Sequence, residues 1–325
     1  MSAAEKAAMR EKARIAFEGT RRERTPWGDA MRQLLKNRAA VAGGIFVIFV
    51  VLVAILADVI APYHFAEVHF ADSYAAPGAK YLAGADYLGR DILSRTIYGS
   101  RVSLAVAFVA STVSLVIGIV VGMVSGYAGG RVDNLLMRLV DFLYGFPFLI
   151  FVILLQVYFK ALSRRGSNLF IVGPLIELNN RMGGLLFIFI AMGFLDWLQM
   201  ARIARGQVLS YKQKEFVEAA RMVGAGDARI IFRHLLPNVL GPCIVSETLA
   251  IPGYIFTEAF LSFIGLGVDA PTPSWGIMIS EGYTGLRSYP YLIMAPAVAL
   301  VLTVLAFNFL GDGLRDAFDP RLRGE

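Results

Sequence analysis

The 325-residue sequence contains few of the residues from which most soluble enzymes build their sites. Its single cysteine, Cys243, lies in an apolar run, so no disulfide framework forms within the chain. Charged residues make up only 17% of the sequence, and it contains three histidines. No segment matches G-x-x-x-x-G-K-[ST], which excludes ATP binding through a P-loop.

Apolar residues are abundant instead. They make up 57% of the chain, and the mean hydropathy of +0.60 is too high for an ordinary soluble domain. The formal net charge of +6 does not indicate nucleic acid here, because cytoplasmic loops and anionic lipid head groups also favour Lys and Arg. The composition therefore predicts an integral membrane protein that contacts the lipid bilayer and has no nucleic-acid partner.

Six segments are apolar and long enough to cross a bilayer, for which a helix needs about 20 residues. They are 39–57, 102–130, 142–159, about 184–203, about 238–268 and 288–311. We therefore predict an all-α integral membrane fold with six transmembrane helices. About forty mostly polar residues precede the first apolar run, and no small-residue cleavage pattern follows it, so we expect an uncleaved first span.

Six spans place both chain ends on one side of the membrane, and the basic residues indicate which side. The predicted loops and ends on that side hold 22 of the 31 Lys and Arg residues, and the opposite loops hold nine. The richer side is cytoplasmic by the positive-inside rule. The charged stretch 215–238, between the fourth and fifth spans, is then a cytoplasmic loop.

That stretch, "EFVEAARMVGAGDARIIFRHLLPN", predicts two short helices. Helical spacing gives the first helix an apolar face of Phe216, Ala219, Ala220 and Val223 and a charged face of Glu215, Glu218 and Arg221. Gly224 and Gly226 can end this helix by adopting positive φ, and Asp227 is a suitable N-cap for the next. The pattern by itself fits two roles equally, docking of a soluble partner and an interfacial helix on lipid.

The same stretch resembles the EAA loop of binding-protein-dependent ABC importer permeases, in Glu218-Ala219-Ala220, Gly224, Ile231 and "HLLPN". Other stretches resemble the oligopeptide/dipeptide/nickel branch of that family, and most of all the C-type permeases of oligopeptide systems. These stretches are "YLGRDILSRTIYGSRVSL" (87–104), "WLQMARIARGQVLSYKQKEFVEAAR" (197–221), "FLSFIGLG" (260–267), "PSWG" (273–276) and "FNFLGDGLRDAFDPR" (307–321). The resemblance extends from residue 27 to residue 323.

The resemblance implies a type I ABC importer permease fold, in which the EAA loop is a coupling helix that sits in a groove on an ATP-binding subunit. It also implies a second homologous permease, two ABC ATPase subunits and an extracytoplasmic substrate-binding protein that delivers a peptide, assembled in a bacterial inner (plasma) membrane. ATP and Mg²⁺ would be bound by the ATPases, and this chain would bind no cofactor or metal and hold no catalytic residue. The implied ATPase-coupling residues are Glu215, Phe216, Glu218, Ala219, Ala220, Arg221, Gly224, Ala225 and Arg229.

The chain is expected to divide along its length into segments on alternating sides of the membrane. The segments are a basic cytoplasmic arm (1–38), a first transmembrane helix (39–61), a periplasmic segment (62–101), a five-helix permease core (102–312, with the EAA loop at about 210–237) and a cytoplasmic tail (313–325). Within the periplasmic segment, the amphipathic stretch 88–101 predicts an interfacial helix that braces the second span. Residues 160–183 form a longer outer connection than this family usually has, and we expect a re-entrant or surface helix there.

Four acids in or beside the predicted spans are candidates for the translocation path, because ionisable residues in membranes are often functional. They are Asp141, Asp196, Glu247 and Glu258. Glu247 and Glu258 lie 11 residues apart, so an unbroken helix places them on one face, although a proline and a glycine between them can bend it. Asp196 can pair with Arg202 or Arg205. Path lining and structural pairing both remain open.

Two further patterns have an ordinary structural interpretation. Gly118, Gly122 and Gly126 form two G-x-x-x-G steps, which favour close helix packing within the chain over a contact between subunits. His64 and His69 are five residues apart and do not share a helical face, so we expect solvated loop histidines rather than a metal site.

Three other functions are compatible with parts of the sequence. A nickel or other small-solute importer of the same family shares its motifs. An ion-driven secondary transporter would use the membrane acids but requires interrupted helices in repeated halves, which the sequence does not display. An integral-membrane enzyme would need a clustered metal set or a nucleophile arrangement, and neither pattern occurs.

The orientation can be tested with topology reporters. Fusions after residue 75 and after residue 285 should report an extracytoplasmic location, and fusions after residue 212 and at the C-terminus a cytoplasmic one, because of the distribution of basic residues. A matched pair of alkaline phosphatase and green fluorescent protein fusions measures both sides. An extracytoplasmic signal at residue 212 would refute the ATPase-coupling interpretation.

Overall fold

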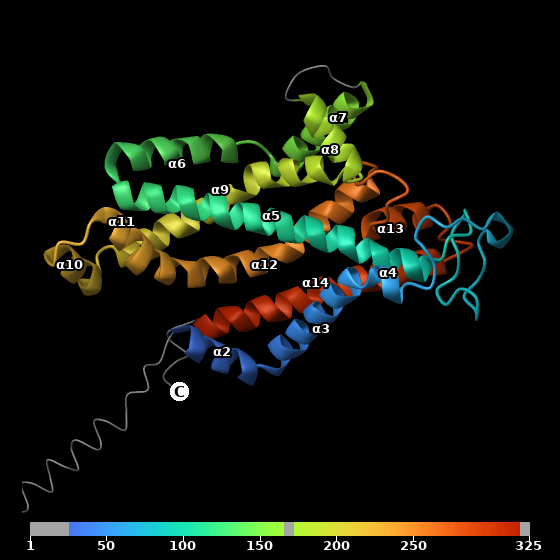
Figure 1. The fold of residues 1–325 in the computed structure, drawn as a ribbon, viewed down its shortest axis with the longest axis horizontal. Coiled ribbons are helices and arrows are strands. Elements are labelled where there is room, and N and C mark those ends of the chain that lie inside the picture. The colour runs from blue at the N-terminus through green and yellow to red at the C-terminus, as the bar shows by residue number, and fades with distance from the viewer. Residues whose placement is uncertain (1–25, 166–171, 319–325) are drawn as a thin grey trace, which may run out of the picture.

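The computed structural model describes residues 26–165 and 172–318, and most of these residues are helical (Figure 1). The elements are α2 (Pro26–Lys36), α3 (Arg38–Ile55), α4 (Ala57–Ile60), η1 (Phe70–Asp72), α5 (Ile92–Ala128), α6 (Gly130–Tyr144), α7 (Phe148–Arg165), α8 (Val172–Arg181), α9 (Leu185–Tyr211), α10 (Glu215–Met222), α11 (Asp227–Arg229), the π-helical η2 (Ile230–Leu235), α12 (Leu236–Phe263), α13 (Trp275–Tyr283) and α14 (Tyr291–Phe318). Within the described ranges, β structure is limited to one isolated bridge between Ala85 and Asp91.

Five helical stretches are long and apolar enough to cross a membrane. They are α3, α5, α9, α14 and the stretch Asp227–Phe263 that includes α12. Helices α6 and α7 meet the same criterion only as a pair bent by 77°, which makes them a broken span or a re-entrant loop. The helix predicted over 142–159 is therefore interrupted between α6 and α7, and this segment is the sixth span if the bent pair crosses the membrane as one. Pro147 explains the break, because proline lacks an N–H and disfavours helical backbone at the residue before it.

Some expected boundaries also shift. Helix α14 continues to Phe318, past the boundary predicted at residue 312, and α8 forms part of the long connection between α7 and α9. The remainder of that connection, 166–171, and most of the predicted basic arm lie outside the described residues. The described end of the arm forms α2, which packs against α14.

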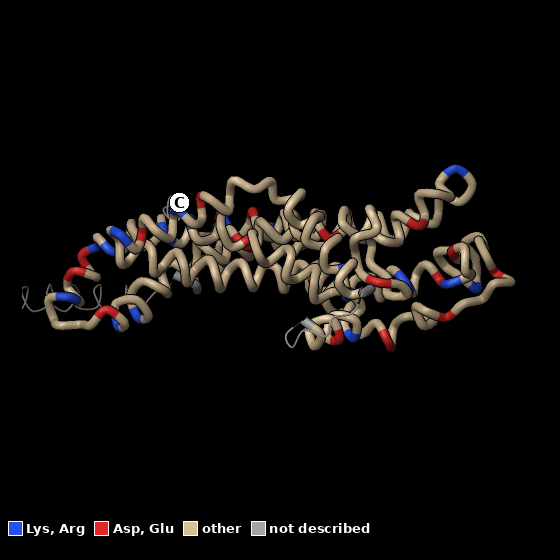
Figure 2. Tube along the Cα trace, turned by 90° about the horizontal axis from the view of Figure 1, so that it is seen from above, with Lys and Arg blue, Asp and Glu red and all other residues tan. Residues whose placement is uncertain are grey.

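Charged side chains gather at the two ends of the elongated molecule, and the middle is nearly free of them (Figure 2). One end carries α10 and α11, and the other carries the loops around α4 and α13 (Figure 1). An apolar belt between two charged ends is the distribution that a bilayer imposes on a helical membrane protein.

Helix α5 runs without a break for 37 residues, so the separate interfacial helix predicted over 88–101 is wrong. Asp91 caps the start of α5 by accepting a hydrogen bond from the backbone N–H of Ser94 at 2.7 Å. The polar side of this first stretch is not directed at lipid head groups. Arg95 is instead buried within the protein, because acids from two other segments approach it.

These acids and arginines form an ionic cluster of Asp86, Arg90, Arg95 and Glu281. Arg95 Nη1 donates to Asp86 and, at 2.8 Å, to Glu281 of α13. Arg90 Nε donates to Asp86 at 2.6 Å. A buried charge that loses its partner is strongly destabilising, so the cluster holds the loop before α5, α5 itself and α13 in one arrangement.

The first loop (residues 61–91) is held by further polar contacts. The backbone N–H of Tyr63 donates to Ser94 Oγ of α5 at 3.0 Å. Asp72 accepts from Lys80 Nζ at 2.5 Å and from the Tyr81 hydroxyl at 3.0 Å, and these two donors hold the pKa of the Asp72 carboxyl below its usual value. The loop is therefore fixed to itself and to the start of α5.

Glycines allow α5 to lie directly against α9. A Cβ atom on Gly122 would come within 2.5 Å of the carbonyl oxygen of Ala201, and on Gly118 and Gly126 it would lie 2.5 and 2.9 Å from α9 side chains. The two G-x-x-x-G steps therefore pack within the chain, which confirms the prediction. Helix α12 covers the same pair, so these three helices form the centre of the bundle.

Replacing Gly122 with Val should destabilise the bundle. The new side chain meets the α9 backbone, and such overpacking costs about 1–3 kcal/mol. The measurement is the melting temperature of the purified protein in detergent. Gly206→Val on α9 is the matched control, because no atom lies within 4 Å of a Cβ built there. Equal melting temperatures for the two variants would contradict the close contact.

Candidate functional site

The charged hairpin (residues 215–235) lies at one end of the molecule and consists of α10, α11 and η2 (Figure 1). Gly224 ends α10 with φ of +82°, and its N–H donates to the carbonyl oxygen of Arg221 at 2.9 Å. The predicted role of Gly224 is confirmed. Gly226 has φ of −69° and stands at the N-cap position of α11, so the N-cap predicted at Asp227 is wrong.

A small apolar contact seats the hairpin on the spans. Val217 of α10 and Ile230 of η2 are buried in one cluster with Met123, Val208 and Val239 from α5, α9 and α12. These side chains connect the hairpin to the ends of all three central helices. The hairpin is therefore a packed part of the helix bundle.

The apolar face predicted for α10 does not pack against the helix bundle. Val217 is the α10 residue that packs inward, whereas Phe216 is 42% exposed and Val223 is 85% exposed. The difference has a physical reason. Because α10 lies beyond the ends of the spans, only one side chain reaches the bundle, and the rest of its surface faces away from it.

Polar contacts add to this seating. The Tyr127 hydroxyl, near the end of α5, donates to Asp227 Oδ1 at 2.6 Å. Arg221 lies over the Tyr127 ring, 6.0 Å from its centroid. Lys212 Nζ, at the end of α9, donates to the carbonyl oxygen of Gly126 on α5 at 2.8 Å. Asp227 and Arg221 thus tie the hairpin to the end of α5, and Lys212 ties the end of α9 to the same helix.

A second ion pair fixes the helices just behind the hairpin. Arg205 of α9 makes two hydrogen bonds of 2.6 Å with Asp133 of α6, and Ser125 of α5 also donates to Asp133. Sequence reasoning missed Asp133, because its partner is 72 residues away and no local pattern connects them.

Most of the predicted coupling residues share the exposed surface of the hairpin. The exposed ones are Glu215, Phe216, Glu218, Ala219, Arg221, Gly224 and Arg229, and the half-buried ones are Ala220 and Ala225. Three large apolar side chains extend this surface: Met222 is 89% exposed, Val223 85% and Phe232 69%. Exposed apolar side chains on a charged surface of a membrane protein mark a contact either with another macromolecule or with lipid. Met222 and Phe232 were not predicted.

The acids of α12 are buried and hydrogen-bonded. Glu247 accepts from Ser114 at 3.1 Å and from Tyr254 at 2.8 Å. Glu258 accepts from Ser103 at 2.9 Å and from Ser262 at 2.7 Å. Helix α12 passes its internal prolines without ending, so both acids lie on one helix facing α5.

Asp196 shares a cavity of about 100 Å³ with Glu247 and Tyr254. Its Oδ2 atom is buried and has no hydrogen-bond partner among the described residues. The expected partners of Asp196 bind elsewhere, because Arg202 pairs with Asp141 at 2.6 Å and Arg205 pairs with Asp133.

The four candidate path acids therefore do not form one group. Asp141 is an exposed member of an ion pair, and Glu258 is enclosed by serines. Only Asp196 and Glu247 line a common cavity. Within the described residues, no three His, Cys, Asp or Glu side chains are placed to hold a metal ion.

Tyr127→Phe should loosen the charged hairpin. It removes the donor to Asp227, and a hydrogen bond to a charged group contributes about 1.5–3 kcal/mol when buried and less when exposed. Amide hydrogen exchange in 215–229 should accelerate about three- to tenfold, as measured by mass spectrometry on the purified protein. Tyr211→Phe is the control, since it removes a hydroxyl from the same apolar cluster without touching Asp227. Unchanged exchange in Tyr127→Phe would show that this contact does not hold the hairpin.

Comparison with known proteins gives two family matches. Residues 118–324 match the family described as "Binding-protein-dependent transport system inner membrane component". Residues 25–77 match the "N-terminal TM domain of oligopeptide transport permease C". Together these matches cover most of the chain.

Named relatives are similar along almost the whole length. The oligopeptide transport system permease protein OppC of Escherichia coli (strain K12) is 44% identical over 302 residues, which is 92% of this chain and 93% of that protein. OppC of Bacillus subtilis (strain 168) is 39% identical over 91% of this chain and 90% of the relative. The dipeptide transport system permease protein DppC of the same organism is 41% identical, over 91% and 86%.

The fold also has a solved counterpart. A structure of the MetNI methionine ABC transporter in inward-facing conformations matches with a TM-score of 0.50 at 20% identity, over 68% of this chain and 95% of that chain. This likeness confirms the predicted permease fold. The chain belongs to the family of binding-protein-dependent transport system inner membrane components.

Proposed function

We propose that this chain is a membrane-spanning permease subunit of an ATP-driven ABC importer that translocates oligopeptides or dipeptides across a bacterial inner (plasma) membrane. Its similarity to OppC and DppC proteins over more than nine-tenths of its length supports the peptide class. Both chain ends lie on the cytoplasmic side in this proposal, in line with the distribution of basic residues.

The observation that carries the proposal is the charged hairpin. It exposes Met222, Val223 and Phe232 among charges, and its inner side packs on the ends of α5, α9 and α12. A partner bound to the outer side would therefore act on three spans at once. We assign this partner role to an ATPase subunit, because the chain contains no P-loop of its own.

The proposed complex contains this chain, a second homologous permease, two ABC ATPase subunits and an extracytoplasmic substrate-binding protein. The ATPases bind ATP and Mg²⁺, and this chain supplies no catalytic residue and binds no cofactor. Closure of the ATPases pushes on the hairpins of the two permeases. The spans then switch the shared cavity between outward and inward access, so ATP hydrolysis is converted into peptide movement.

The membrane acids divide into two roles in this proposal. Ser103 and Ser262 surround Glu258, which supports structural pairing. Asp196 has a free carboxylate oxygen in the cavity with Glu247, and this pair is the better candidate for a polar step in the path. Asp141, at an exposed ion pair, is assigned to helix positioning.

Other functions receive less support. A nickel or other small-solute importer would use the same hairpin, and the substrate is decided largely by the binding protein. An ion-driven secondary transporter would not need a rigid docking hairpin, and Glu247 and Glu258 accept hydrogen bonds from serines of α5, which is an uninterrupted helix.

The docking role predicts that Val223→Asp and Glu218→Lys abolish coupling without unfolding the chain. Val223→Asp places a charge in the proposed apolar contact with the ATPase, and Glu218→Lys inverts a charge on the same surface. Loss of a central interface contact costs more than 1 kcal/mol, which lowers the affinity for the ATPase about fivefold to tenfold. The reconstituted complex should lose at least about four-fifths of the ATP hydrolysis that loaded binding protein stimulates.

Val59→Asp is the matched control, because Val59 is 82% exposed and lies on α4, at the opposite end of the molecule. This variant should keep normal stimulation and still co-purify with the ATPase subunits. If both hairpin variants show full stimulation, the hairpin is a passive surface element and the proposed coupling role is wrong.

A further inference from the structure

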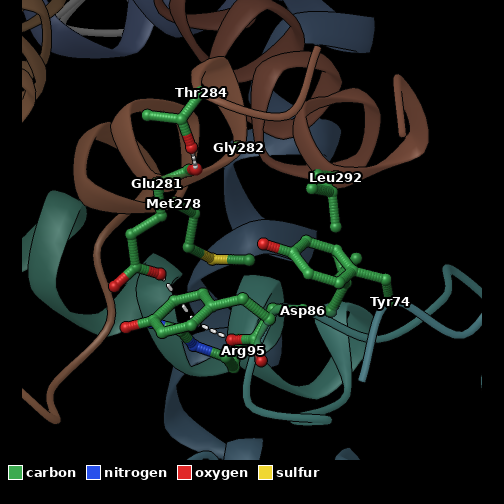
Figure 3. A pocket seen from close by; sticks show the side chains of 10 residues that line it. Tyr74, Asp86, Arg95, Met278, Glu281, Gly282, Thr284 and Leu292 are labelled. Atoms are coloured by element: carbon green, nitrogen blue, oxygen red, sulfur yellow. Dashed lines mark hydrogen bonds and ion pairs between the residues drawn. The ribbon is translucent and has the colours of Figure 1, made fainter. Parts of the chain in front are cut away.

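A cavity of about 290 Å³ lies at the end of the molecule opposite the charged hairpin. Three segments that are distant in sequence meet there, as Figure 3 shows: Tyr74 enters from the first loop, Arg95 from α5, and Glu281 from α13. Met278 and Leu292 complete its apolar wall. The ionic cluster forms its polar side, so the cavity has both charged and apolar walls.

The cluster does not use all of its hydrogen-bonding capacity. Asp86 is saturated, because it accepts from both arginines and from the backbone N–H groups of Leu88 and Arg90. Glu281 differs: its side chain is 26% exposed, and the ion pairs use only its Oε2 atom. Glu281 is therefore the carboxylate with an oxygen free for a ligand.

Arg95 contributes an unused donor. The side chain is 98% buried, its hydrogen bonds to Asp86 and Glu281 both come from Nη1, and Nη2 makes no hydrogen bond to the described residues. A guanidinium donor without a partner in a buried site calls for an explanation, and a bound acceptor is one such explanation. The wall thus offers one acceptor and one donor side by side.

Tyr74 lines the cavity in an unusual conformation. Its φ is +57°, the left-handed region that costs a non-glycine residue about 1 kcal/mol or more. The ring stacks on Tyr289 with centroids 4.4 Å apart, and the Tyr291 hydroxyl donates to the Tyr74 carbonyl oxygen at 2.6 Å. These contacts fix the ring in the cavity, between Leu292 and Asp86 (Figure 3).

We propose that this cavity binds the amino-terminal residue of a peptide. The α-ammonium group binds Glu281 and the face of the Tyr74 ring, since aromatic faces attract cations. The first peptide carbonyl accepts from the Arg95 guanidinium, and the first side chain packs on Met278 and Leu292. The cavity thus offers an acceptor for the ammonium group, a donor for the peptide carbonyl and an apolar wall for the side chain.

The charges of the wall favour this end of the peptide over the carboxyl end. The ionic cluster is balanced as a whole, because Arg90 and Arg95 pair with Asp86 and Glu281. The group it leaves open to the cavity is the second carboxylate oxygen of Glu281, which attracts an ammonium group and repels a carboxylate. The small volume holds only one or two residues, so peptides of different length can share the site.

This inference rests on the proposed function, in which the cavity lies on the outer side and meets peptides as the binding protein releases them. The full-length chain, with the subunits that co-purify, is placed in lipid nanodiscs without binding protein. Binding of the tripeptide Leu-Gly-Gly and of its N-acetyl derivative is then measured by microscale thermophoresis. N-acetylation should weaken binding at least about tenfold, because it removes the charge that pairs with Glu281.

Two variants and a control locate the site. Glu281→Gln should weaken Leu-Gly-Gly binding about tenfold or more and remove the preference for the free amine, and Leu292→Trp, which fills the cavity, should abolish binding. Glu177→Gln is the control, since Glu177 is an exposed acid of α8 that pairs with Arg181 away from the cavity. Equal binding of both peptides, full binding in Leu292→Trp, or no binding to the unmodified protein would overturn the inference.

The proposed function is judged separately. ATP-dependent import of Leu-Gly-Gly by the unmodified complex with its binding protein is measured in proteoliposomes. Import without cavity binding overturns this inference and leaves the proposed function standing. Absence of import of every peptide tried overturns the proposed function itself.

Discussion

The contact between α5 and α9 determines where both ends of this molecule lie. Side chains larger than hydrogen at Gly118, Gly122 and Gly126 would force the two backbones apart. In a bilayer, where lipid tails are as apolar as the helices, such close packing replaces the hydrophobic effect as the source of helix association. The two helices then present a shared end to the charged hairpin, and α5 contributes Arg95 to the ionic cluster at its other end.

The sequence was informative where the physics is local. Apolar length predicts the spans, and the alternation of charge and small residues predicts the hairpin with its stop at Gly224. It was less informative where long-range packing decides. Nothing in the spacing of residues 215–223 identifies Val217 as the inward side chain, because that depends on how far α10 lies beyond the bundle. Pro147 is a sequence signal for the break between α6 and α7. The apolar run on both sides of it nevertheless fits one continuous span, so the break was not predicted.

Contacts between distant segments were out of reach for the same reason. Arg95 and Glu281 are 186 residues apart, and the amphipathic pattern around Arg95 fits a lipid surface as well as a buried cluster. Similarly, Asp196 has arginines nearby in sequence, but α6 supplies their actual partners. A local charge pattern shows which residues can pair, and only the tertiary arrangement selects among them. The candidate acids therefore have different surroundings: Asp141 forms an exposed ion pair, Asp196 lines a cavity, and Glu258 is bonded to serines.

Helix α5 has a mechanical consequence. Its 37 residues without a break give a rod of about 55 Å, with Tyr127 near one end and Arg95 near the other. A rod of that length that pivots near its middle by about 5° moves each tip by roughly 2–3 Å in opposite directions. A displacement of that size is enough to break a hydrogen bond or to open a small cavity. A rotation of α5 as a rigid body can thus couple a movement of the charged hairpin to a change in the cavity at the opposite end. No series of side-chain rearrangements along the helix is needed.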